Sequence, residues 1–267
     1  MPTIEIRNAY IHYDEYGTAA ETVVFSHGLL WSGEMFREQT KALQNQYRCF
    51  TYDHRGQGRS EVTSDGYDMD SLTEDALEFI KKVVGKPCHF VGLSMGGFIA
   101  MRLAARYPEW IKSVILLETS ADPEPPENVP RYNTLNTVVR WLGTWAVASK
   151  VMQIMFGQKF LTDPSRAALR KEWRKKLTSN KKTITKAVQG VIERKPVFEE
   201  LKNIKAPVLI MVGDQDVATV PAKSERIKSQ IPQAELVIIP GAGHTSTVEE
   251  PEFVNQKILE FLEKIFK

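Results

Sequence analysis

Short apolar runs alternate with amphipathic stretches along most of the chain. The runs after residue 87 are dense in Val, Ile, Leu and Met, as expected of strands covered on both faces. Strands are predicted over residues 3–7, 10–15, 22–26, 47–52, 88–93, 112–118, 207–213 and 235–239, and helices over 33–44, 71–84, 95–106, 221–230 and 251–265. This order predicts an α/β fold: a mostly parallel eight-stranded sheet with helices on both faces, which binds ligands at the carboxyl ends of its strands.

One long segment, residues 122–200, interrupts the alternation because it contains no strand-like run. It begins with a Pro-rich stretch and continues with several helical stretches. We therefore predict a helical cap over 122–200, inserted into a core made of residues 1–121 and 201–267. Inserted helical segments commonly cover active sites. The basic run at 170–176 is interpreted as a solvated helix face.

The sequence Gly-Leu-Ser-Met-Gly at 92–96 stands where a predicted strand ends and a predicted helix begins. Such a turn holds its serine on a strained backbone, with the hydroxyl exposed at the sheet edge. Gly92 and Gly96 lack the Cβ atoms that would collide across the turn. The five-residue pattern alone is a weak signal, but strand, turn and helix together nominate Ser94 as a nucleophile.

A serine nucleophile needs a base that takes its proton, and the base needs a carboxylate that orients it. His244 lies in a glycine-lined loop after the last predicted strand, and it is preferred as the base over the other four histidines. Asp214 and Asp216 both follow the preceding strand. Asp216 is preferred as the acid, because Asp214 is better placed to cap the turn. Glu118 remains a fallback acid or a polar group of the pocket wall.

The chain order Ser94, Asp216, His244 resembles that of the α/β-hydrolase superfamily. The resemblance covers nearly the whole chain, through His27-Gly28, the sequence DHRGQGRS at 53–60, the Ser94 turn, Gly-Asp-Gln-Asp at 213–216 and Gly-Ala-Gly-His at 241–244. It implies an oxyanion hole made by the backbone N–H groups of Leu29 and Met95, worth about 3 kcal/mol each in the transition state. The sequence contains no metal-ligand cluster, phosphate loop or dinucleotide motif, so neither a metal nor a cofactor is predicted.

The identity of the nucleophile bears on the reaction. Haloalkane dehalogenases and epoxide hydrolases of this fold use Asp at the turn, whereas Ser94 favours acyl transfer through an acyl-enzyme. The chain looks most like cap-bearing esterases and lactonases, such as 3-oxoadipate enol-lactonases and N-acyl-homoserine lactonases, which implies a carboxylic ester hydrolase acting on a small ester or lactone. A perhydrolase or a C–C hydrolase would use the same triad, and a non-enzymatic small-ligand receptor is an alternative of another class.

The two lactone classes call for different pockets. A 3-oxoadipate lactone carries a carboxylate, for which a cap cation such as Arg131 or Arg140 is expected to reach inward. A fatty acyl-homoserine lactone is neutral and needs an apolar pocket, and the apolar side chains of the cap favour this second class. The residues expected to line the pocket are Trp31, Glu118, Trp141, Trp145, Met152, Met155, Phe156 and Val217.

Composition bears on the possible partners and the cellular location of the protein. The chain has 267 residues, 42% of them hydrophobic, and a formal net charge of +2, too small to indicate nucleic acid or an anionic membrane as a partner. Cys49 and Cys88 are interpreted as buried free thiols, which suits a reducing compartment. No signal peptide or membrane-spanning stretch is recognised, so a cytoplasmic location is expected. No pattern predicts an oligomeric state.

Overall fold

A computed structural model describes residues 2–265 as an eight-stranded sheet with the strand order β1-β2-β4-β3-β5-β6-β7-β8. β2 runs antiparallel to β1 and β4, and the pairs from β4 through β8 are parallel, which confirms the predicted mostly parallel sheet. The strands are β1 (Thr3–Ile6), β2 (Ala9–Tyr16), β3 (Thr22–Ser26), β4 (Arg48–Tyr52), β5 (Cys88–Leu93), β6 (Ile111–Leu117), β7 (Val208–Gly213) and β8 (Glu235–Ile239).

Helices cover both faces of the sheet. Successive residues of the central strands point to opposite faces, so each strand contributes side chains to two apolar cores. Phe90 and Val114 belong to the apolar core under α2, α3 and α9, whereas Val91 and Ile115 belong to the core under α1 and α11. This explains the continuous apolar runs of the central strands. The helices of the core are α1 (Arg37–Leu43), α2 (Met69–Phe79), α3 (Met95–Arg106), α9 (Pro221–Gln230), α10 (Ser246–Glu249) and α11 (Pro251–Ile265).

Two predicted helices differ in detail from the structure. The stretch expected over 33–44 begins as a 3-10 turn, η1 (Gly33–Phe36), before α1. α2 starts two residues before the expected position, because the side chain of Asp68 caps its first turn by accepting a hydrogen bond from the Ser71 N–H at 2.8 Å. The helix then continues as a π-helical turn, η2 (Ile80–Val84), which ends at Gly85 with φ +71°.

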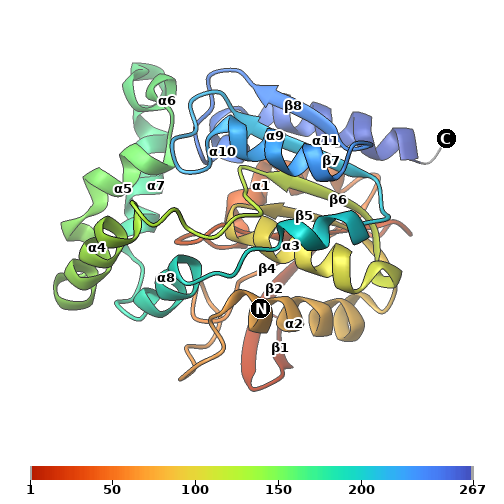
Figure 1. Ribbon diagram of the computed structural model, residues 1–267, viewed down its shortest axis with the longest axis horizontal. Coiled ribbons are helices and arrows are strands. Elements are labelled where there is room, and N and C mark those ends of the chain that lie inside the picture. Colours follow the sequence, from red (N-terminus) through yellow and green to blue (C-terminus); the bar gives the residue numbers. More distant parts are fainter. Residues whose placement is uncertain (1, 266–267) are drawn as a thin grey trace.

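The segment between β6 and β7 is helical. Its helices are α4 (Val129–Leu142), α5 (Ala148–Met155), α6 (Gln158–Thr162), α7 (Ala167–Thr178) and α8 (Ile184–Ile192), and a 3-10 turn, η4 (Thr144–Ala146), joins α4 to α5. Figure 1 shows these helices gathered on one side of the sheet, away from the C-terminal end of α11. Within residues 2–265, no helix is long and apolar enough to cross a membrane.

Candidate active site

Ser94 occupies the sharp turn between β5 and α3. Its backbone has φ +53° and ψ −111°, a strained conformation for a residue other than glycine. The turn is tight enough to exclude side chains at both flanking glycines: a Cβ on Gly92 would lie 2.2 Å from the Gly96 carbonyl oxygen, and one on Gly96 would lie 1.9 Å from the Ser26 carbonyl oxygen. The glycines therefore allow α3 to begin directly against β3 and β5.

Ser94, His244 and Asp216 form one hydrogen-bonded chain across three loops at the carboxyl ends of β5, β8 and β7. The distance from His244 Nε2 to Ser94 Oγ is 2.8 Å, and that from His244 Nδ1 to Asp216 Oδ2 is also 2.8 Å. All three side chains are buried. This is the geometry of a nucleophile, a base and an orienting carboxylate.

Asp216 is held as a carboxylate despite its burial. Burial tends to raise its pKa, but the His244 charge and the hydrogen bonds from Thr219 bring the pKa below its usual range. The Oδ1 atom accepts the N–H groups of Ala218 and Thr219 at 2.8 and 3.0 Å, and the Thr219 hydroxyl donates to Oδ2 at 2.8 Å. An ionised Asp216 can stabilise the imidazolium that forms when His244 takes a proton.

Neither of the other two candidates for the acid of the triad, Asp214 and Glu118, is suited to that role. Asp214 is exposed and accepts the Gly241 N–H at 2.8 Å, which braces the turn that leads to the His244 loop. Glu118 is fully buried, and burial together with the charges of Asp216 and Glu249 raises its pKa well above the usual range. Because burial disfavours its charged form, Glu118 is unsuited to the role of the triad anion.

The loop after β3 carries one of the two expected oxyanion donors. His27 Nδ1 lies 2.8 Å from the Gly28 carbonyl oxygen, and His27 Nε2 accepts the His54 N–H at 2.9 Å. The adjacent Leu30 N–H donates to Gln57 Oε1 at 2.9 Å. Leu29 lies between Gly28 and Leu30, whose backbone groups make these hydrogen bonds. Met95 is the first residue of α3, where backbone N–H groups lack partners within the helix. The two N–H groups remain the predicted oxyanion hole.

A profile of the alpha/beta hydrolase fold matches residues 21–251, which include the Ser94 turn, Asp216 and His244. The chain belongs to the α/β-hydrolase family. The match includes strands β3 to β8 and the cap helices as well as the site.

Other members of the α/β-hydrolase family resemble the chain over nearly its full length. BpoC of Mycobacterium tuberculosis, named as a candidate non-heme bromoperoxidase, is 29% identical over 261 residues, covering 95% of this chain and 97% of its own. The solved enol-lactonase of Burkholderia xenovorans is 27% identical with a TM-score of 0.91, covering 98% of this chain and all of its own. The solved esterase of Thermogutta terrifontis is 26% identical with a TM-score of 0.90, covering 99% and 97%.

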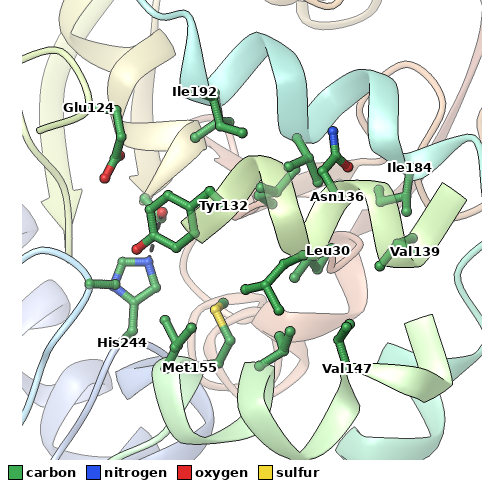
Figure 2. Close-up of a pocket in the computed structure, with 18 of the residues that line it drawn as sticks. Leu30, Glu124, Tyr132, Asn136, Val139, Val147, Met155, Ile184, Ile192 and His244 are labelled. Atoms are coloured by element: carbon green, nitrogen blue, oxygen red, sulfur yellow. Dashed lines mark hydrogen bonds between the residues drawn. The ribbon is translucent and has the colours of Figure 1, made fainter. Parts of the chain in front are cut away.

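A cavity of about 150 Å³ in this α/β hydrolase reaches Ser94 and His244 and extends under the cap. Figure 2 shows Glu124 and Tyr132 on the His244 side, and Val139, Val147 and Ile184 farther away. Most of the lining is aliphatic or aromatic: Leu29, Leu30, Phe98, Tyr132, Leu135, Val139, Val147, Val151, Ile154, Met155, Leu177, Ile184, Val188, Val191, Ile192 and Ala218. Arg194 also lines the cavity, but its guanidinium donates to Glu124 at 2.7 Å and is thereby neutralised.

Several residues expected to line this cavity lie elsewhere. Trp31 is buried between the cap and the core, with ring centroids 5.1 Å from Trp173 and 6.0 Å from Phe156. Met152 and Phe156 belong to the same packed cluster and are also absent from the cavity lining. These expectations were wrong because the large apolar side chains hold the cap on the sheet, which leaves the cavity to smaller ones.

Of the other residues expected to line the cavity, one lies in the lining and the rest lie outside it. Trp141, Trp145 and Val217 are exposed and absent from the lining, and Glu118 is buried away from it. Met155 does line the cavity, as expected. Arg131 and Arg140 are exposed and also lie outside the lining, so neither supplies the inward-facing cap cation that a carboxylate-bearing lactone calls for.

The cavity residues that sequence reasoning missed include one set on α4 and one on α8. On α4 they are Tyr132, Leu135, Asn136 and Val139, and on α8 they are Ile184, Val188, Val191 and Ile192. Both sets follow the spacing of one helix face. The helical spacing of apolar residues in these two stretches is the signal that identifies them. The prediction instead chose the large aromatic residues of the cap, most of which pack or are exposed.

Glu249, at the end of α10, joins the His244 loop to the cap. It accepts the N–H groups of Gly243 and Thr245, each at 3.1 Å, and the N–H of Gly157 at 2.8 Å. Burial raises its pKa to about 7, although the three N–H groups act in the opposite direction. Because Gly243 and Thr245 flank the base, Glu249 is a positioning residue for His244.

Replacing Glu249 by alanine is expected to lower the free energy of unfolding by about 3 kcal/mol, because it leaves buried N–H groups without an acceptor. We also expect kcat/KM to fall about tenfold, since the His244 loop loses its brace. Glu249→Gln keeps one acceptor oxygen and should recover part of both losses. Urea unfolding and ester hydrolysis measure the two effects. The exposed Glu252→Ala should change stability by less than about 0.5 kcal/mol, and an equal loss there would contradict the assignment.

Proposed function

We propose that this α/β hydrolase cleaves uncharged carboxylic esters or lactones with an aliphatic acyl group through an acyl-enzyme on Ser94. The observation that carries the proposal is the apolar cavity that opens directly onto the hydrogen-bonded Ser94 and His244. The esterase and the enol-lactonase among the relatives support this reaction class. Within it, the N-acyl-homoserine lactone type is the finer proposal.

The reaction follows from the positions of the three side chains. Ser94 Oγ bonds to the substrate carbonyl carbon while its proton passes to His244 Nε2, and the carbonyl oxygen becomes an oxyanion facing the N–H groups of Leu29 and Met95. The carbon–oxygen bond to the alcohol then breaks, and His244 returns the proton to the leaving alkoxide. Water attacks the acyl-Ser94 carbonyl with His244 again as base, which releases the acid and restores Ser94.

The charge and size of the cavity favour a neutral, short acyl chain. Among the described lining residues Arg194 is the one Lys or Arg, and its pairing with Glu124 leaves no free cation for a substrate carboxylate. An engineered cavity of similar volume holds benzene, so the space suits about six carbon atoms. These features weigh against a 3-oxoadipate lactone as substrate. Within the N-acyl-homoserine lactones, we propose a hexanoyl chain rather than a longer one.

A panel of substrates tests this proposal. It contains N-hexanoyl- and N-dodecanoyl-homoserine lactones, nitrophenyl esters of increasing acyl length and the 3-oxoadipate enol-lactone, with Ser94→Ala as the blank. The highest kcat/KM is expected for neutral substrates with acyl chains of about six carbons. Faster turnover of the carboxylate-bearing lactone would refute the neutral-substrate proposal, and absence of turnover across the panel would favour a non-enzymatic receptor.

Narrowing the cavity should shift acyl-chain preference. Val147 lies at the end of the cavity away from His244, so Val147→Trp is expected to shorten the preferred acyl chain by two or more carbons, each lost CH₂ contact being worth about 0.8 kcal/mol. The measurement is kcat/KM across the ester series. Val217→Trp is the matched control, because Val217 is exposed and outside the lining. The same shift in both variants would count against the mapped cavity.

A further inference from the structure

Positive charge is concentrated in the cap helices. Residues 129–195 contain 15 Lys and Arg against 3 Asp and Glu, whereas the whole chain contains 35 and 33. The net charge of +2 therefore hides a formal charge of +12 on residues 129–195, which falls to +7 over the whole cap of residues 122–200, and a remainder of the chain that is acidic. Figure 1 shows that these helices lie together on one side of the molecule, so the charge is also separated in space.

An apolar patch is exposed on the same cap. Trp141 and Leu142 end α4, and Trp145 lies in η4, with 73%, 55% and 65% of their surfaces exposed. Single exposed apolar residues are ordinary on a protein surface, but two tryptophans and a leucine within five positions form a group. We call these three residues the tryptophan patch.

Unpaired cations flank the tryptophan patch. Arg140 directly precedes it, Lys150 follows in the first turn of α5, and Lys182 donates a hydrogen bond to the Trp141 carbonyl oxygen at 2.5 Å. All three are exposed, and none has a carboxylate within 4.0 Å among residues 2–265. Lys176, elsewhere in the cap, is paired with Glu34. The patch thus combines apolar side chains with charges that the protein leaves uncompensated.

We propose that the tryptophan patch and its flanking cations dock this protein on an anionic lipid surface. Tryptophan is favoured at the boundary between the headgroups and the acyl chains, Leu142 can enter the apolar layer, and Arg140, Lys150 and Lys182 can meet anionic headgroups. A nucleic acid would satisfy the charge but offers no apolar layer for Leu142. A second copy bound through the same face would bring two strongly positive segments together, each with a formal charge of +12 over residues 129–195.

The patch is adjacent in sequence to the distal lining of the Ser94 cavity. Val139 and Thr144 line that cavity, while the neighbouring Trp141 and Trp145 face solvent. Docking would therefore bring the cap end of the cavity near a phase in which neutral acyl substrates collect. This link to catalysis rests on the proposed function, whereas the docking itself does not.

Vesicle co-sedimentation tests the docking directly. The full chain should bind vesicles of phosphatidylcholine and phosphatidylglycerol in equal parts, bind phosphatidylcholine alone at least about tenfold more weakly, and lose binding as salt rises. The double variant Trp141→Ser, Trp145→Ser should reduce binding at least about tenfold and leave hydrolysis of a water-soluble nitrophenyl ester unchanged. That hydrolysis assay separates failure of docking from failure of the proposed function.

Control variants test whether any exposed aromatic residue or any lysine, rather than those of the tryptophan patch, contributes to vesicle binding. Tyr10→Ser removes an aromatic side chain, 57% exposed, from β2, and it should leave vesicle binding intact. Lys150→Glu with Lys182→Glu should weaken binding to anionic vesicles, whereas the exposed Lys205→Glu, outside the cap, should not.

Several results would overturn the docking proposal. They are equal binding to neutral and anionic vesicles, no binding to either, an equal loss in the control variants, or binding of duplex DNA as tight as that of anionic vesicles. A dimer in analytical ultracentrifugation that the tryptophan double variant dissociates would assign the patch to self-association instead.

Discussion

Replacing Ser94 by alanine is expected to lower kcat for nitrophenyl hexanoate by on the order of 10⁵- to 10⁶-fold while leaving the fold intact. Alanine removes the oxygen that lies 2.8 Å from His244 Nε2, so no acyl-enzyme can form. The oxyanion donors and the cavity remain, which leaves some rate above the uncatalysed reaction. Because the strain at Ser94 resides in the backbone turn, we expect little change in the free energy of unfolding. Stopped-flow hydrolysis and urea unfolding measure the two quantities.

Ser120→Ala is a suitable comparison for Ser94→Ala. Ser120 is also buried and follows the end of β6, but its hydroxyl accepts the Asp122 N–H, whereas His244 Nε2 is hydrogen-bonded to Ser94. Its loss should change kcat by less than about threefold. Residual activity of Ser94→Ala within tenfold of the unmodified protein would mean that another group is the nucleophile.

Replacing Asp216 by asparagine should lower kcat about 10⁴-fold. An asparagine that donates its amide N–H to His244 Nδ1 forces the proton onto Nε2, where His244 can no longer accept the Ser94 proton. The variant also loses the negative charge that stabilises the imidazolium, while the size of the side chain is unchanged. The measurement is kcat/KM against pH, in which the variant should show low activity at every pH.

Asp214→Asn is the matched control for Asp216→Asn. Asp214 lies two residues earlier and also follows β7, yet its carboxylate accepts the Gly241 N–H rather than a bond from His244. An asparagine oxygen can accept the same bond, so kcat should stay within about threefold of the unmodified value. The opposite ranking of the two variants would make Asp214 the acid.

The sheet and the order of the site residues were accessible from the sequence for a physical reason. Dense apolar runs specify strands buried on both faces, and a glycine on each side of Ser94 marks a turn that excludes Cβ atoms. In a parallel sheet, residues that follow neighbouring strands meet at one edge. Ser94, Asp216 and His244 follow β5, β7 and β8, so the parallel sheet places all three at the same edge.

The cavity lining was not accessible in the same way. A large apolar residue in a cap serves equally well as packing, lining or exposed surface, and the sequence does not distinguish these environments. Trp31 packs, Met155 lines the cavity and Trp145 is exposed. The separation of charge between cap and core likewise disappears when only the net charge is considered.

The central claim, an acyl-transfer nucleophile at Ser94, is tested most directly by covalent labelling. The protein is treated with an alkyl fluorophosphonate, which phosphonylates activated serines, and is then analysed by intact-mass and peptide mass spectrometry. One adduct on the peptide that contains Ser94 is predicted, with labelling lost in Ser94→Ala and strongly slowed in Asp216→Asn. An adduct on another residue, or no adduct on a preparation that still hydrolyses esters, would contradict the claim.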